Sequence, residues 1–222
     1  MRVILLPGLD GTGELLAEFA AALAPEFDPS VLPYPPDRVL DYPQLTAWVR
    51  ERLPRDEPFA LVAESYSGPV ALALAAERPA DLVGVVLCAS FAKAPRPRWG
   101  PLLGLMPLAA LGRLPLILLM PLLMGRWSSR RWAGRVHAAL RGVAPAVLRQ
   151  RLRDVTTVDL ASCIGRIACP LLYLRASRDR LVGADNWQLI RDASRHAVCI
   201  EIEGPHFLLQ AKPRECAAAI KR

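Results

Sequence analysis

The stretch that most constrains how this chain folds is residues 58–78, PFALVAESYSGPVALALAAER. Its early part, residues 59–63, is a short apolar run, which predicts a buried strand. Its late part, residues 69–77, is rich in Ala and Leu and begins with proline, which predicts a helix. Few residues separate the two elements, so the chain must turn abruptly from strand to helix with Ser65 at the centre of the turn.

A turn this tight strains the backbone of its central residue and requires small neighbours. Ala63 and Ser67 flank Ser65 at the spacing of the G-x-S-x-G pattern, the nucleophile elbow, although both glycines are replaced. The alternative interpretation is an N-cap serine, which accepts a hydrogen bond from the first turn of the helix. The choice depends on whether the rest of the chain supplies an acid, a histidine and an oxyanion hole.

The composition indicates one globular domain. The chain has 222 residues, of which 53% are apolar and 22% are charged. Much of the net charge of +7 comes from arginines in residues 126–153, a segment without a nucleic-acid motif, so no nucleic-acid partner is expected. A solvated helix face explains this cluster; attraction to anionic lipid or substrate is the alternative.

The cysteines and the N-terminus indicate the cellular compartment. The five cysteines lack paired short spacing, which argues against a disulfide framework and against a zinc site. The apolar run of residues 3–6 is too short for the core of a signal peptide. We therefore expect a cytoplasmic protein without a bound metal.

Apolar runs and amphipathic segments alternate along the chain. The expected strands are residues 2–6, 29–33, 59–63, 82–87, 170–174 and 198–202. The expected helices are residues 14–23, 45–53, 69–77, 186–193 and 207–220, the last interrupted or restarted at Pro213. This order predicts an α/β fold, with a mainly parallel sheet flanked by helices. In such sheets the functional groups gather in loops at the carboxyl ends of the strands.

The loop after the first strand, residues 7–13, is rich in glycine. It lacks the lysine of a nucleotide P-loop and does not fit G-x-G-x-x-G. Its better use is to supply a backbone amide, that of Leu9, to an oxyanion hole whose second donor is the amide of Tyr66. A glycine-rich turn without any ligand is the alternative.

Two further loops carry an acid and a histidine. Asp179 follows the fifth expected strand and can reach across to orient a histidine, unless it merely caps a turn or helix. His206 follows the last strand at the same sheet edge. Of the other two histidines, His137 lies in the arginine-rich segment and His196 in a polar context, so His206 alone is placed to meet Ser65.

The order Ser65, Asp179, His206 is that of the α/β-hydrolase triad, and the sequence resembles a compact α/β-hydrolase over essentially its whole length. LPGLDGTG resembles the oxyanion loop, AESYSG the elbow, SRDRLV the acid loop and GPHF the histidine loop. The chain departs from the family in lacking its first two strands, since the oxyanion loop begins at Pro7. Many esterases also carry His-Gly where this chain has Pro7 and Gly8.

The resemblance implies a serine hydrolase acting on a carboxylic ester or thioester with an apolar moiety. His206 would take the proton of Ser65, and Asp179 would fix the imidazole. The amides of Leu9 and Tyr66 would stabilise the oxyanion, and no cofactor is required. Acyltransferases, C–C hydrolases and lyases share this framework. The rival from another class is a non-catalytic binding protein on the same fold.

Residues 91–167 interrupt the alternation, which predicts a helical lid inserted between core segments 1–90 and 168–222. Part of it, residues 101–124, is almost wholly apolar, but Arg113, prolines and glycines break the run and disfavour a membrane-spanning helix.

Three methionines of the expected lid, Met106, Met120 and Met124, are predicted to line the acyl site; ordinary helix packing is the alternative. A membrane-surface role for the lid is a minority hypothesis. It would use four arginines, which are Arg126, Arg130, Arg131 and Arg135. The oligomeric state is left open.

Overall fold

Six strands form one parallel sheet in the computed structural model, which describes residues 1–95 and 116–221. The strands are β1 Arg2–Leu6, β2 Asp28–Val31, β3 Phe59–Glu64, β4 Leu82–Cys88, β5 Leu171–Ala176 and β6 Ala197–Ile202. Their spatial order is β2-β1-β3-β4-β5-β6, and every neighbouring pair is parallel. The predicted α/β fold with a parallel sheet is therefore confirmed.

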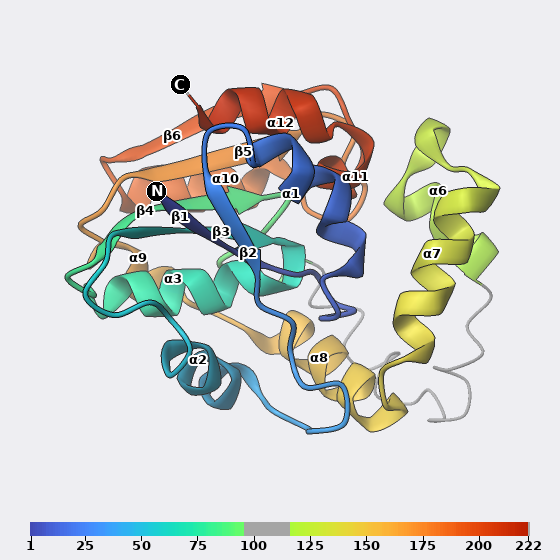
Figure 1. Cartoon of the computed structure of the whole chain (residues 1–222), viewed down its shortest axis with the longest axis horizontal. Coiled ribbons are helices and arrows are strands. Elements are labelled where there is room, and N and C mark those ends of the chain that lie inside the picture. Colours follow the sequence, from blue (N-terminus) through green and yellow to red (C-terminus); the bar gives the residue numbers. More distant parts are fainter. Residues whose placement is uncertain (96–115, 222) are drawn as a thin grey trace.

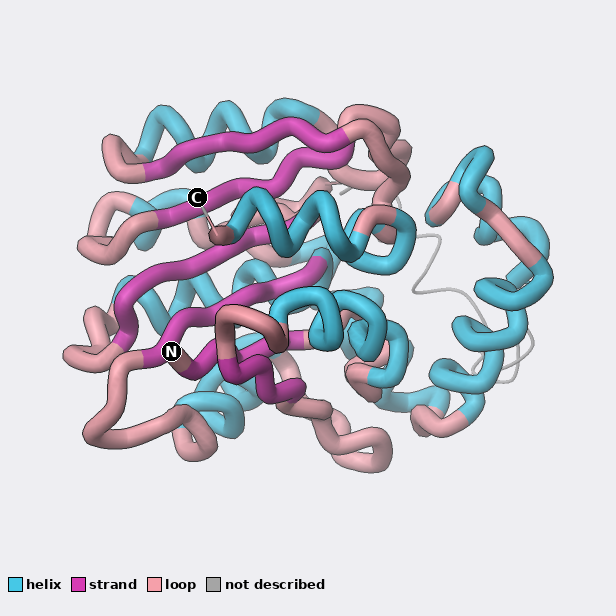
Figure 2. Tube along the Cα trace, turned by 45° about the horizontal axis from the view of Figure 1, so that its top comes forward, coloured by secondary structure: helices cyan, strands magenta, loops and turns pink. Residues whose placement is uncertain are grey.

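Helices cover both faces of the sheet (Figures 1 and 2). On one face lie η1 Glu14–Leu16, α1 Ala17–Leu23, α11 Leu208–Ala211 and α12 Pro213–Ile220. On the other face lie α2 Tyr42–Arg50, α3 Gly68–Ala76, α9 Ala161–Ile164 and α10 Ala184–Ala193. The short helix η2 Ser65–Ser67 joins β3 to α3.

The core has two halves because successive side chains of a strand point to opposite faces. In β1, Val3 and Leu5 pack under α1, α11 and α12, whereas Ile4 and Leu6 pack toward α2 and α3. All four side chains are buried. A strand buried on both sides reads as a continuous apolar run, which is why such runs marked the strands in the sequence.

Two helix ends show how local chemistry sets element boundaries. Helix α2 begins at Tyr42, before the expected start, because Asp41 and Gln44 form a capping box with a proline in the first turn. The expected interruption at Pro213 is confirmed: α11 ends at Ala211, and Pro213 opens α12.

The middle of the chain contributes α6 Leu116–Leu123, η4 Gly125–Trp127, α7 Arg130–Arg141 and α8 Pro145–Thr157. Helices α6 and α7 stand beside the end of the sheet at which the strands finish (Figure 1). Arg131 and Arg135 of α7 form ion pairs with Glu18 of α1. No helix in the described ranges is long and apolar enough to cross a membrane.

Candidate active site

The turn after β3 has the strained geometry that the sequence predicted. Ser65 follows β3 directly and has a φ of 45°, a left-handed conformation that is unusual for a residue other than glycine. Such a residue costs on the order of 1–3 kcal/mol and persists only where the surroundings hold it. Here the hydroxyl of Ser90 donates to the carbonyl oxygen of Ser65 at 2.6 Å. The side chain of Ser65 is half-buried at the carboxyl edge of the sheet.

Close packing behind this turn requires a glycine. A Cβ atom added to Gly68 would lie 1.8 Å from the hydroxyl oxygen of Ser90. Ser90 is itself fully buried, and its carbonyl accepts a hydrogen bond of 2.6 Å from the hydroxyl of Tyr173. The turn is thus held by side chains from the loop after β4 and from β5.

Ser65, His206 and Asp179 are brought together from the ends of three different strands. The Oγ atom of Ser65 lies 2.8 Å from Nε2 of His206, and Nδ1 of His206 lies 2.9 Å from Oδ2 of Asp179. The Asp179 carboxylate accepts a hydrogen bond from the N–H at Nδ1 of His206. This tautomer leaves Nε2 unprotonated and able to accept the hydroxyl proton of Ser65. The other two histidines, His137 and His196, are exposed.

Asp179 is fixed in place by its own loop. Its Oδ1 atom accepts hydrogen bonds from the amides of Leu181, at 2.8 Å, and Val182, at 2.9 Å. The side chains of His206 and Asp179 are only 4% and 5% exposed. Water competes little for this pair, so the imidazole is held in one orientation.

Glu64 is a titratable group of the site that no sequence motif marks. It lies next to Ser65 in β3, is 4% exposed, and its Oε1 atom has no hydrogen-bond partner among the described residues. Burial raises the pKa of this carboxyl to about 7, and Asp10 adds to the rise, while Gln210 and His206 oppose it. The sequence feature that could have indicated this group is a glutamate at the end of an otherwise apolar strand.

The two residues expected to supply oxyanion donors lie in the loops beside Ser65. Tyr66 is in the first turn of η2, where amide groups lack partners within the helix. Its carbonyl accepts a hydrogen bond of 2.9 Å from the hydroxyl of Tyr42. Leu9 lies in a turn closed by the amide of Gly11, which donates to the carbonyl of Gly8 at 3.0 Å. The use of the Leu9 and Tyr66 amides stays a prediction.

The methionines expected to contact substrate have different positions. Met106 lies outside the described residues, whereas Met120 and Met124 are buried in one cluster with Leu15 and with residues of α7. Phe207, the neighbour of His206, packs against this cluster. The cluster therefore borders the histidine loop, and a contact of these methionines with substrate stays a prediction.

Metal ligands are not clustered in the described part of the chain. No group of three or more His, Cys, Asp and Glu side chains there is arranged to hold an ion. All five cysteines are free, and three of them are buried.

The fold and the site define a class of protein. The serine sits on a strained strand-to-helix turn, and the aspartate and histidine follow it in chain order at later strand ends. This is the arrangement of α/β-hydrolases. A sequence profile of the alpha/beta hydrolase family matches residues 3–219. The chain therefore belongs to the alpha/beta hydrolase family and is a hydrolase.

Solved structures of low sequence identity share the fold. A lipase-esterase related protein from Clostridium acetobutylicum is 14% identical, with a TM-score of 0.83 over 99% of this chain and 93% of its own. A hydrolase from Oleispira antarctica is 15% identical, with a TM-score of 0.84 over 99% and 90%. An esterase from Thermogutta terrifontis is 16% identical, with a TM-score of 0.76 over 100% and 88%. No sequence among the curated proteins matches significantly.

Proposed function

We propose that this hydrolase uses Ser65 as a nucleophile to cleave a carboxylic ester or thioester with an apolar moiety. The observation that carries the proposal is the pair of contacts that links Ser65 to His206 at 2.8 Å and His206 to Asp179 at 2.9 Å. Both distances suit hydrogen bonds. The nucleophile is therefore within reach of its base, and the base is within reach of the acid that orients it.

The chemistry follows from the weakness of an alcohol as a nucleophile. As Ser65 attacks the carbonyl carbon, His206 takes the hydroxyl proton at Nε2 and then passes it to the leaving alcohol or thiol. Asp179 stabilises the imidazolium that forms. Water then attacks the acyl group on Ser65, with His206 again as general base, and the serine is regenerated. These steps need no metal or organic cofactor.

The negative charge that develops on the carbonyl oxygen needs hydrogen-bond donors. We assign the amides of Leu9 and Tyr66 to this role, each worth about 3 kcal/mol in comparable sites. Support comes from their positions: Tyr66 directly follows the nucleophile in the first turn of η2, and Leu9 lies in the turn after β1, the strand paired with β3.

The lid expected at residues 91–167 includes residues 96–115, which lie outside the described residues. Within this segment, α6 and α7 act in this proposal as a helical lid that shapes the apolar part of the substrate site. Its support is the buried cluster of Met120 and Met124, which reaches Phe207 beside His206, and the hydrogen bond from the amide of Phe207 to the carbonyl of Leu123 at 3.1 Å. The proposed partner is a small apolar ester or thioester, and a cytoplasmic location is part of the proposal.

The test is hydrolysis of p-nitrophenyl esters from acetate to laurate, together with labelling by a fluorophosphonate. Wild-type protein should turn over and be labelled, while Ser65→Ala and His206→Ala should each lose about 10⁴-fold or more in kcat. Matched controls are Ser162→Ala and His137→Ala, which change exposed side chains of the same types.

The outcomes separate the alternatives. Full activity in both control variants with loss in both site variants would support the triad, and the preferred chain length would size the pocket. Labelling without turnover would direct attention to an acyltransferase, a C–C hydrolase or a lyase on the same framework. Neither labelling nor turnover in the wild type would contradict the proposal and favour a binding protein.

A further inference from the structure

Arg151 of α8 is a buried cation next to the candidate oxyanion loop. Its exposure is 3%, although the surrounding segment is rich in exposed arginine. Burying a guanidinium costs several kcal/mol unless its donors are satisfied. The hydrogen-bond partners of the guanidinium therefore indicate which part of the structure Arg151 stabilises.

The guanidinium makes three hydrogen bonds within the described part of the chain, and each goes to a backbone carbonyl oxygen. Nη1 donates to the carbonyls of Leu9, at 2.9 Å, and Asp10, at 2.6 Å, and Nη2 donates to that of Pro35 at 3.3 Å. Two of these carbonyls belong to the loop of residues 7–13. The loop is in turn shaped around the arginine, because a Cβ atom at Gly11 would lie 2.3 Å from Nη1.

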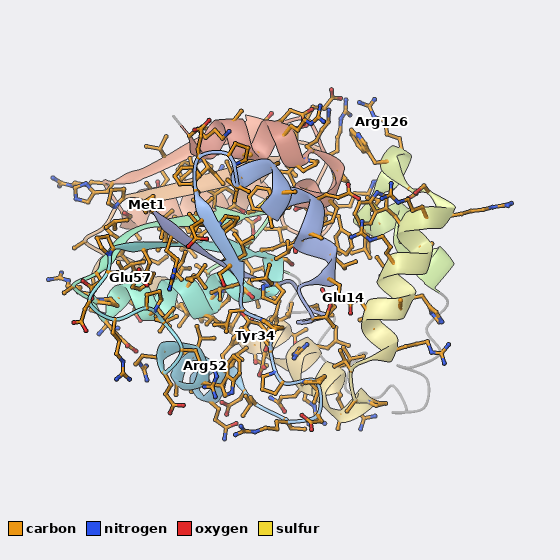
Figure 3. The ribbon with its side chains drawn as sticks, viewed as in Figure 1. Met1, Glu14, Tyr34, Arg52, Glu57 and Arg126 are labelled. Carbon is orange, nitrogen blue, oxygen red and sulfur yellow. The ribbon has the colours of Figure 1, made fainter. Side chains whose placement is uncertain are left out.

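Two tyrosine rings border the guanidinium. Its central carbon lies 5.7 Å from the ring centroid of Tyr34 and 6.0 Å from that of Tyr66. Figure 3 labels Tyr34 on the same side of the sheet as α8. Burial lowers the pKa of Arg151, while the tyrosines, Asp10 and Asp154 counter that shift.

These contacts determine which way the Leu9 amide points. A trans peptide is planar, so its N–H and C=O point in opposite directions. The peptide before Leu9 is fixed by the hydrogen bond from the Gly11 amide to the Gly8 carbonyl. The peptide after Leu9 is fixed by Arg151. The N–H of Leu9 lies in the first of these planes, because it belongs to the peptide between Gly8 and Leu9. The Gly11 amide that holds this plane shares its own peptide with the Asp10 carbonyl, which accepts from Arg151 at 2.6 Å. Arg151 therefore acts on the Leu9 amide through the Asp10 carbonyl and the Gly11 amide.

The same helix also contacts the side chain of Tyr66, the residue whose amide is the second candidate donor. The hydroxyl of Tyr66 donates to Oδ2 of Asp154 at 3.3 Å, and Asp154 lies one turn after Arg151 on α8. Helix α8 thus reaches Leu9 through its arginine and Tyr66 through its aspartate. The first contact joins α8 to the loop after β1, and the second joins it to η2 after β3. Neither contact involves α6 or α7.

We propose that Arg151 is a positioning residue of the active site, which clamps the carbonyls of Leu9 and Asp10 and thereby aims the Leu9 amide at the oxyanion. This inference rests on the proposed function. It adds that α8 is a fixed support of the site, although α8 falls within the segment expected to be a lid. Arg151 itself does not touch the reacting atoms.

The test compares Arg151→Lys and Arg151→Ala with Arg153→Lys and Arg153→Ala, since Arg153 is an exposed arginine on the same helix. A lysine cannot span several carbonyls as a planar guanidinium does. Both Arg151 variants should lose about 10- to 100-fold in kcat for the preferred p-nitrophenyl ester, because a displaced oxyanion donor acts in the transition state. KM should stay within about threefold.

Rescue separates positioning from general stability. Methylguanidinium should fit the space left in Arg151→Ala and restore part of kcat in a saturable manner, without affecting either Arg153 variant. Thermal melting shows which variants are folded, and Arg151→Lys decides the question if Arg151→Ala does not fold.

Four results would overturn the inference while leaving the proposed function intact. They are a folded Arg151 variant with wild-type kcat, a loss confined to KM, a folded Arg151→Ala without rescue, and failure of both Arg151 variants to fold. A wild-type protein that neither turns over nor is labelled would instead remove the proposed function. The two failures are therefore distinguishable.

Discussion

The hydroxyl of Ser67 donates a hydrogen bond to the backbone carbonyl of Pro7, which joins the turn carrying Ser65 to the loop after β1. Because this uses the only proton of Ser67, its oxygen accepts from the hydroxyl of Tyr34 at 2.5 Å. Ser67 and Tyr34 are 0% and 3% exposed. The residue that replaces the second glycine of the elbow pattern thus connects the nucleophile's turn to the oxyanion loop, which a glycine does not do.

Ser67→Ala should destabilise the protein by about 1–3 kcal/mol, because the Pro7 carbonyl and the Tyr34 hydroxyl would be left buried without this partner. Urea unfolding of the variant and the wild type measures the difference. Thr157→Ala is the matched control, since it removes an exposed hydroxyl that also donates to a carbonyl, and should change stability by less than about 0.5 kcal/mol. Equal stability of Ser67→Ala and wild type would show that the contact contributes nothing.

Asp179→Asn should lower kcat by roughly 10⁴-fold while the protein stays folded, by analogy with the same change in a serine protease triad. An amide that donates toward Nδ1 of His206 forces the proton onto Nε2, and the imidazole can then no longer accept from Ser65. Ester hydrolysis measures the loss. Asp192→Asn, at an exposed aspartate of α10, should keep wild-type activity. A variant at position 179 that keeps kcat within tenfold would argue against the role of Asp179.

The sequence was sufficient to predict the sheet and the convergence of three side chains, Ser65, Asp179 and His206, at its carboxyl edge. Most strands are apolar runs bounded by turn residues. Ser65 follows β3 directly, and Asp179 and His206 lie in the loops after β5 and β6, so their convergence is a consequence of parallel topology. The start of α2 was missed because it depends on the reciprocal capping of Asp41 and Gln44.

The polar groups behind the site could not be predicted in the same way. Ser90 and Tyr34 make contacts with residues 25 and 33 positions away in the chain, so their partners are defined only by tertiary packing. Arg151 did leave a faint signal. The buried positions of α8 include Val147, Arg151 and Asp154, which recur at helical spacing, so the arginine continues an inward-facing stripe.

The stability of the protein should fall between about pH 4.5 and pH 7 through Glu64. Burial raises the pKa of this carboxyl to about 7 in the folded state, from the ordinary value of 4.5 that it has in the unfolded chain. Between these two values the folded state binds more protons than the unfolded state, so the free energy of unfolding decreases as the pH rises. Glu64→Gln, which stays neutral, should lack this drop. It should be more stable than wild type above pH 7, by at most about 3 kcal/mol, with the difference vanishing near pH 4.5.

Urea unfolding at several pH values between 4.5 and 8 measures this difference. Glu51→Gln is the control, because Glu51 is an exposed glutamate at the end of α2, and its curve should run parallel to that of the wild type. Parallel curves for Glu64→Gln and wild type would mean that the buried carboxyl titrates near its ordinary pKa.

Two glycine-to-alanine changes should have opposite effects on stability. Gly68→Ala should cost about 1–3 kcal/mol, because the new methyl group would lie 1.8 Å from the hydroxyl oxygen of Ser90 and must displace it. Since Ser90 holds the carbonyl of Ser65, kcat should fall as well. Gly134→Ala, within α7, meets no atom of the described residues within 4 Å and should stabilise the protein by up to about 1 kcal/mol through helix propensity.

Thermal melting and ester hydrolysis of both glycine variants test this expectation. A stable Gly68→Ala with full activity would mean that the strained turn at Ser65 tolerates a shift of Ser90, and that the 2.6 Å contact between them does not hold the nucleophile. Loss of stability in Gly134→Ala would instead show that helix propensity does not govern this position of α7. Because the two sites differ in packing but share the same chemical change, the comparison isolates the effect of the close approach at Gly68.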